Sequence, residues 1–154
     1  MENKGLAKMF GPLGKDEFRR LMILVYDTET TGLPRDWNAP ISNSDNWPRL
    51  VQLAWQLHDE NGALLSRGNR IVRPDGFTIP FNSIKIHGIT TDRALAEGSP
   101  LDEVVAEFMA DAARANYIMG HNIGFDVNVV GAELLRLGQS VSYTHLRAHE
   151  TSEN

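Results

Sequence analysis

The feature that most constrains the fold is Leu21–Tyr26, LMILVY, the longest apolar run in the chain, which leads directly into Asp27. An unbroken run of this length and composition is typical of a strand buried on both faces of a sheet. It is far shorter than the roughly 20 apolar residues that span a bilayer, so we expect no membrane-spanning helix. A chain of 154 residues with 42% apolar and 23% charged residues has the size and composition of one globular domain.

The charge balance limits the ways in which the chain can bind a polyanion. It has 15 Lys and Arg against 20 Asp and Glu, a formal net charge of −5, which excludes a broadly basic nucleic-acid-binding surface but not local binding through metal ions. The absence of cysteine removes disulfides, thiolate catalysis and cysteine-ligated zinc. Residues 1–20 carry no secretory signal pattern, so we interpret them as a leader, native or not, and expect a cytoplasmic protein.

Three extended segments open the structured part of the chain. Pro34–Pro48 follows the first strand as a long polar loop, and Leu50–His58 then alternates apolar and polar residues as a half-buried strand does. Asn61-Gly62 predicts a tight turn into another extended stretch that reaches about Val72. We therefore expect an antiparallel beginning to the sheet.

Helical patterns follow. Ser99-Pro100 predicts a capping serine and a first-turn proline for a helix whose apolar stripe is Leu101, Val104, Val105, Phe108 and Ala112. Tyr117–Met119 predicts a short strand, and Asp126–Leu137 predicts a second helix that stops at Gly138. The order β-β-β-α-β-α is an α/β pattern.

The C-terminal tail is unlike the rest of the chain. Val141–Thr151, VSYTHLRAHET, resembles the in-frame translation of a transposon-based sequencing adapter residue for residue. The resemblance implies that the natural sequence ends near Gln139, so that residues 21–139 are an incomplete domain and residues 140–154 an artefactual tail. Because the apolar residues of this tail keep neither a helical nor a strand period, we expect it to be structurally idle.

The strongest chemical signal is Asp27-Thr28-Glu29-Thr30-Thr31-Gly32, at the end of the first predicted strand. Residues i and i+2 of a strand point the same way, so the Asp27 and Glu29 carboxylates project from one face. Such a pair is costly at a buried strand end unless it is protonated or paired with a cation, and Mg²⁺ and Mn²⁺ prefer oxygen ligands of this kind. Thr30 and Thr31 add hydroxyl groups, and Gly32 allows a substrate to approach the backbone closely.

A second signal, Gly120-His121-Asn122-Ile123-Gly124-Phe125-Asp126, joins the short strand to the last predicted helix. Asp126 is expected at the start of that helix, where the dipole favours an anion, and a plain helix-capping aspartate is the alternative interpretation. Groups at the carboxyl ends of neighbouring strands face one crevice in an α/β sheet. We therefore expect Asp126 to meet Asp27 and Glu29.

These two motifs, in this order, resemble those of the DEDD family of 3′–5′ exonucleases. The resemblance covers about Met22 to Gln139 and implies an RNase H-like α/β fold, a mixed sheet with flanking helices, here C-terminally truncated. It implies that Asp27, Glu29 and Asp126 bind two Mg²⁺ or Mn²⁺ ions, which activate water and stabilise the leaving 3′-oxygen. It also implies a substrate-binding group that touches the DNA 3′ end: Thr30, Thr31, Gly32, Leu33, His87, His121, Asn122 and Phe125. By itself, His87 also fits a turn, and Leu33 and Phe125 also fit a core.

The sequence from Glu29 to Gly62 is similar to the exonuclease segment at the N-terminus of some bacterial DNA polymerase III alpha chains. That similarity implies proofreading, with a replicative DNA polymerase as partner. An RNA-directed exonuclease and a non-catalytic nucleic-acid-binding module remain alternatives. The family's last motif, a His or Tyr base with a fourth acid, does not occur in residues 127–139, and His145 and Glu150 receive no role. We therefore expect the chain to be inactive as it stands.

Overall fold

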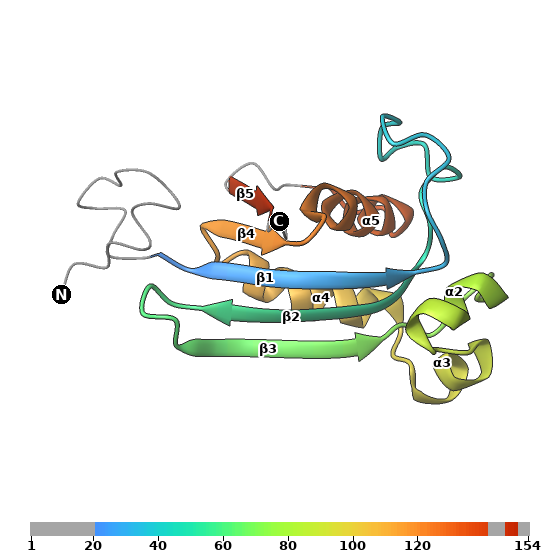
Figure 1. The fold of residues 1–154 in the computed structure, drawn as a ribbon, viewed down its shortest axis with the longest axis horizontal. Helices are drawn as coiled ribbons and strands as arrows, with labels where there is room; N and C mark the ends of the chain where they lie inside the picture. The colour runs from blue at the N-terminus through green and yellow to red at the C-terminus, as the bar shows by residue number, and fades with distance from the viewer. Residues whose placement is uncertain (1–20, 142–146, 151–154) are drawn as a thin grey trace.

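The computed structural model describes residues 21–141 and 147–150, which form one mixed sheet with the two longer helices packed on one of its faces and the two short helices beyond the end of its strands (Figure 1). The sheet has the strand order β3-β2-β1-β4-β5. β1 pairs antiparallel with β2 and β2 with β3, whereas β1 and β4, and β4 and β5, are parallel. The strands are β1 (Ile23–Thr30), β2 (Leu50–His58), β3 (Leu64–Ile71), β4 (Tyr117–Gly120) and β5 (Arg147–Glu150). The helices are α2 (Phe81–His87), α3 (Thr91–Glu97), α4 (Leu101–Ala112) and α5 (Ile123–Arg136).

This architecture confirms the predicted α/β fold and its antiparallel beginning. β2 has the predicted bounds, and its alternation buries Val51, Leu53, Trp55 and Leu57. The β2–β3 turn is closed by Asp59, whose carboxylate accepts hydrogen bonds from the Asn61 and Ala63 backbone N–H groups. None of the helices within the described residues is long and apolar enough to cross a membrane.

The central strand β1 is covered on one face only, so the prediction that it is buried on both faces is wrong. Leu24 and Tyr26 are buried, whereas Val25 between them is 38% exposed and Asp27 is exposed. The reason is the placement of α4 behind the sheet in Figure 1, where it packs on the Leu24 and Tyr26 side. The opposite face of β1 is therefore the accessible one.

An aromatic cluster fixes α4 against the sheet. The Phe108 ring of α4 meets the Tyr26 and Trp55 rings edge-on, at centroid distances of 4.9 and 5.6 Å. The Trp55 indole N–H donates to Asp111 over 2.8 Å. Gly68 on β3 makes room for the indole, because a Cβ there would lie 2.1 Å from the Trp55 ring. This core fixes the position of β1, the strand that carries Asp27 and Glu29.

The helices differ from the sequence prediction at their ends. The N-cap of α4 is Pro100 rather than Ser99, and α5 begins at Ile123, three residues before the predicted Asp126. The predicted stop at Gly138 is confirmed by its positive φ of 72°. The prediction omitted α2 and α3, since helices of seven residues are too short to display a clear apolar stripe.

The tail also differs from its prediction. Residues 147–150 form β5, which lies parallel to β4 with Arg147 opposite Tyr117, so this part of the tail is not structurally idle. The reason is that strand pairing uses backbone groups and needs no apolar period in the added strand. The expectations for residues 1–20, for His145 and for the rest of the tail lie outside the described residues.

Candidate active site

The first two acids lie together on the uncovered face of the sheet. Asp27 is exposed and Glu29 is half-buried, two residues apart in β1. Thr28 between them points to the opposite, buried face, as strand geometry requires. Both carboxylates therefore lie on one face of the strand, as predicted.

Asp126 reaches the same strand from α5. It lies in the first turn of this helix, and its side chain is 2% exposed. Asp126 Oδ1 accepts hydrogen bonds from the Thr28 hydroxyl over 2.6 Å and from the Thr28 backbone N–H over 3.2 Å. Because β1 and β4 are parallel, with Val25 opposite Met119, α5 begins beside the carboxyl end of β1. Asp126 thus lies against the strand that carries Asp27 and Glu29, hydrogen-bonded to the residue between them.

Thr28 is the residue that joins the three acids, and sequence reasoning missed its role. Its position between two acids within the first motif was the available signal, but the strand pattern alone does not reveal which side chain it meets. The partner lies 98 residues further along the chain. Only the pairing of β1 with β4 brings them together.

The acids influence one another electrostatically. Burial raises the pKa of Asp126 to about 6, the Thr28 hydrogen bonds oppose this rise, and the neighbouring carboxylates Asp27 and Glu29 add to it. Burial and the Asp27 carboxylate raise the pKa of Glu29, whereas His87 lowers it. Asp27, Glu29 and Asp126 therefore repel one another when ionised, and a cation between them would relieve that repulsion.

The three carboxylates are suitable ligands for a hard divalent cation, although they are not already grouped around one position. Within residues 21–141 and 147–150 no three His, Asp or Glu side chains come close enough together to form a ready metal-binding group. The three oxygen donors and their mutual repulsion nevertheless fit Mg²⁺ or Mn²⁺. Gly120 lets β4 lie close to β1, because a Cβ there would lie 3.0 Å from the Tyr26 carbonyl oxygen and 3.0 Å from Ile123 Cδ1.

The residues that follow the acids shape the end of the strand. The Thr30 hydroxyl donates to the Gly32 carbonyl over 2.7 Å, and Gly32 has a φ of 154°. The Thr31 hydroxyl accepts from the Arg49 backbone N–H over 2.9 Å, while the Thr31 N–H donates to the Arg49 carbonyl over 3.0 Å. Both threonine hydroxyls, predicted as substrate ligands, are thus engaged in holding this turn.

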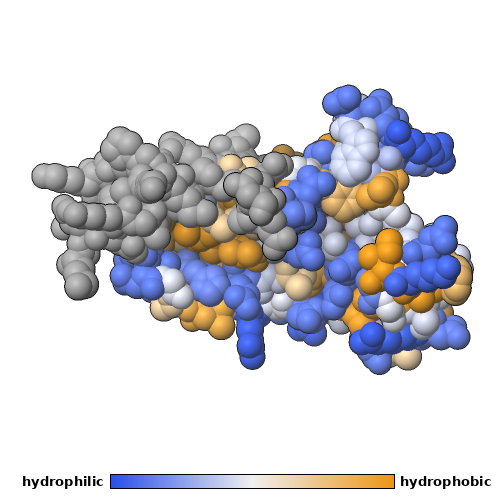
Figure 2. Space-filling view, in the orientation of Figure 1, coloured by the Kyte–Doolittle hydropathy of each residue, from blue (hydrophilic) through white to orange (hydrophobic). Residues whose placement is uncertain are grey.

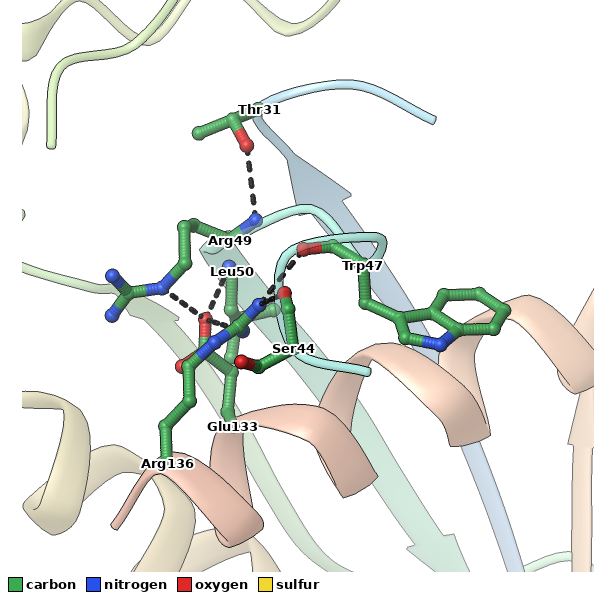
Figure 3. Close-up of polar contacts among 7 residues, drawn as sticks. All are labelled: Thr31, Ser44, Trp47, Arg49, Leu50, Glu133 and Arg136. Carbon is green, nitrogen blue, oxygen red and sulfur yellow. Dashed lines mark hydrogen bonds and ion pairs between the residues drawn. The ribbon is translucent and has the colours of Figure 1, made fainter. Parts of the chain in front are cut away.

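A buried carboxylate, Glu133, ties this turn to α5 (Figure 3). Glu133 Oε1 accepts from the Arg49 side chain and from the Leu50 backbone N–H, each over 2.9 Å. Because Arg49 is also bonded to Thr31, one chain of contacts runs from the first motif to the helix that carries Asp126. Sequence reasoning missed Glu133, since an acid within a helix usually faces solvent.

Arg136 completes the attachment of the long loop to α5. Its guanidinium donates to the Ser44 carbonyl over 2.6 Å and to the Trp47 carbonyl over 2.8 Å, and it lies 3.1 Å from Glu133 Oε1 (Figure 3). Trp47 is itself buried and donates its indole N–H to the Pro40 carbonyl. The loop between β1 and β2 therefore has a defined position against α5.

The other predicted substrate residues surround the acids unevenly. His87 lies at the end of α2, close enough to influence Glu29, and its Nδ1 accepts from the Ile89 N–H over 3.1 Å. Its buried Nε2 has no hydrogen-bond partner within the part of the chain that the structure describes. His121 and Asn122 are exposed between β4 and α5, and Leu33 is exposed in the long loop.

Phe125, the last predicted substrate residue, is half-buried next to Asp126 in the first turn of α5. Its ring lies 5.7 Å from the ring of Trp37 on the long loop. A groove of about 990 Å³ opens on the sheet beside the acids, and its lining includes Asp27, His121 and Arg67. Asp27 is therefore accessible to a ligand from the uncovered face.

A five-stranded mixed sheet of this order, with acids on β1 and at the start of α5, defines an RNase H-like nuclease fold. The Exonuclease (RNase_T) family matches residues 24–149, and the chain belongs to this family of nucleic-acid hydrolases. A search of curated proteins finds no match.

Solved structures of E. coli exonuclease I have the same fold. The complex with a 5cy-dA13 oligonucleotide is 19% identical, with a TM-score of 0.67 over 84% of this chain and 28% of that one. The zinc-bound complex with single-stranded DNA is 21% identical, with a TM-score of 0.68 over 85% and 28%. The product-bound structure is 19% identical, with a TM-score of 0.68 over 85% and 30%. The chain therefore spans less than a third of the length of these proteins.

Proposed function

We propose that this chain carries the site of a 3′–5′ exonuclease that removes nucleotides from DNA 3′ ends with the help of two divalent metal ions. The observation that carries the proposal is the hydrogen bonding of Asp126 to Thr28, which draws a third acid to the Asp27–Glu29 pair. Three mutually repelling carboxylates, of which Asp27 lines an open groove, are costly in a structural role and useful in binding cations. The DNA-bound structures of exonuclease I support DNA as the substrate.

In this proposal Asp27, Glu29 and Asp126 hold the ions, which when bound supply an activated water and stabilise the leaving 3′-oxygen. Thr28 orients the Asp126 carboxylate toward them. His87 accepts the Ile89 backbone N–H at Nδ1, and this hydrogen bond holds the imidazole ring where it influences Glu29. The resemblance of residues 29–62 further favours proofreading beside a replicative DNA polymerase as the role.

The test is digestion of single-stranded DNA labelled at its 5′ end, in Mg²⁺, by a version of the chain continued past Gln139 in its natural reading frame and by Asp27→Ala in that version. We expect shortening from the 3′ end by the continued chain and none by the variant. Mn²⁺ should also raise the melting temperature of the chain but not of Asp27→Ala, because a bound ion stabilises the folded state. Release of nucleotides from the 5′ end, or a variant as active as the parent, would contradict the proposal.

A second candidate, a nucleic-acid-binding module without turnover, is favoured by one observation. The described acids do not form a closed group of three metal ligands. This module would bind DNA, yet would neither cut it nor gain stability from Mn²⁺. The same two measurements therefore separate the candidates. A parallel digestion of an RNA of matched sequence tests whether the substrate is DNA or RNA.

A further inference from the structure

Trp37 is an exposed aromatic residue without a structural need for its position. It is 50% exposed, whereas the other two tryptophans, Trp47 and Trp55, are 3% exposed. Burial of an aromatic side chain is strongly favourable, so an accessible tryptophan beside a candidate site indicates binding. Figure 2 shows hydrophobic atoms directly beneath the hydrophilic tip of the β1–β2 loop, which carries Trp37.

The Trp37 ring lies against Phe125, the residue that precedes Asp126. Its centroid is 5.7 Å from that of Phe125, at an interplanar angle of 48°. Phe125 directly precedes Asp126, the acid that Thr28 holds. The aromatic pair thus begins at the candidate active site and continues outward along the loop.

The loop presents this ring in a held conformation. The Asp36 N–H donates to the side-chain carbonyl of Asn46, and the Asn46 amide donates back to the Asp36 carbonyl, each over 2.8 Å. The Asn38 N–H donates to the Asp36 carboxylate over 2.9 Å. Both neighbours of Trp37 are therefore fixed, and Arg136 fastens the loop to α5 (Figure 3). A ring held in this way loses little freedom when a ligand stacks on it.

We propose that Trp37 and Phe125 form a stacking platform for the unpaired bases of a polynucleotide whose terminal phosphate lies at the three acids. This inference rests on the proposed function and adds a residue that selects single-stranded substrate. Without bound metal ions an acidic site repels phosphates, so affinity must then come from elsewhere. Stacking on aromatic rings supplies it without regard to base sequence, because every base has a π face.

The test compares two fluorescein-labelled oligothymidylates, one intact and one with abasic residues at its last three 3′ positions. Binding is measured by anisotropy without added Mg²⁺, so that hydrolysis does not interfere. We expect the chain to bind the intact strand about tenfold more tightly, Trp37→Ala to lose that preference, and Trp37→Phe to keep most of it. Phe81→Ala is the matched control, since Phe81 is 68% exposed on α2, and it should keep the preference.

Tryptophan emission gives an independent readout. Since Trp47 and Trp55 are buried, oligothymidylate should quench the emission of the chain and leave that of Trp37→Phe almost unchanged. A Trp37→Ala variant that still distinguishes intact from abasic strands would overturn the inference, as would a parent chain that does not distinguish them. Base discrimination by a version of the chain continued past Gln139, without digestion of DNA by that version in Mg²⁺, would instead overturn the proposed exonuclease while the stacking platform stands.

Discussion

Thr28 donates its hydroxyl to Asp126 over 2.6 Å, joining the middle of the Asp27–Glu29 pair to the first turn of α5. Both residues are buried, so the bond is shielded from water. It fixes the one acid of the site that does not come from β1. The position of the third carboxylate therefore depends on a residue that is itself neither acidic nor exposed.

Thr28→Val should lower the free energy of unfolding by about 1–3 kcal/mol, because it removes a donor from a buried acceptor while keeping the shape of the side chain. The pKa of Asp126 should rise further, since the Thr28 hydrogen bonds oppose its elevation. Urea unfolding checks the first effect, and carboxyl chemical shifts followed against pH check the second. Thr28→Ser retains the hydroxyl and should behave like the parent.

Stability should fall as pH rises from about 4 to about 6. The pKa of Asp126 is raised from 3.8 to about 6 in the folded chain, so between these values the folded state binds the proton more tightly than the unfolded state does. That preference favours folding fully below pH 4 and is lost as pH passes 6, a change of about 3 kcal/mol. The raised pKa of Glu29 acts in the same direction.

Asp126→Asn isolates the contribution of this carboxyl group, because the asparagine does not titrate. The difference in unfolding free energy between the parent and this variant should change with pH between 4 and 6 and be flat above 7. A constant difference across that range would show that the pKa of Asp126 is not raised.

In a version of the chain continued past Gln139 in its natural reading frame, Asp27→Ala should abolish Mg²⁺-dependent digestion without destabilising the fold. The Asp27 side chain is exposed, and its charge raises the pKa of both Glu29 and Asp126, so removing it relieves repulsion rather than packing. We expect a melting temperature equal to or above that of the parent in metal-free buffer. Asp75→Ala, at another exposed acid, is the control for general charge effects, and turnover within tenfold of the parent would refute the assignment of Asp27.

Glu133→Ala should cost about 3 kcal/mol or more, because it leaves Arg49, Arg136 and the Leu50 N–H without their shared acceptor. Glu133→Gln should cost less, since its carbonyl oxygen still accepts a hydrogen bond. The exposed ion pair of Arg93 with Glu97 is the comparison, and Glu97→Ala should change stability by less than about 1 kcal/mol. Equal losses from both alanine variants, measured in urea, would mean that the buried network does not hold the loop.

Deletion of residues 140–154 should lower the free energy of unfolding by no more than about 1 kcal/mol, because β5 is a four-residue strand at one edge of the sheet. Thermal unfolding of the deleted and parent chains measures the difference. A larger loss would mean that β5 is integral to the domain, against the adapter-like origin that we propose for the tail.

Much of the fold could be predicted because the deciding patterns are local. Alternation along Leu50–His58, the tight turn at Asn61-Gly62 and the apolar stripe of α4 each follow from residues a few positions apart. The acids were recognisable for the same reason, since Asp27 and Glu29 are neighbours on one strand. The short helices α2 and α3 were not predictable, because a seven-residue segment displays too little of a period.

The sequence by itself determined that strands β1 to β4 and the long helices α4 and α5 form, and that Asp27 and Glu29 share a face. Only the tertiary structure decided that β1 has one open face, that Thr28 rather than a cation partner holds Asp126, and that Glu133 is a buried anchor. These features join residues that are 84 to 98 positions apart. The physical reason is that burial and hydrogen bonding depend on which groups pack against a side chain. Strand pairing and helix placement determine those groups, and local sequence patterns do not specify them.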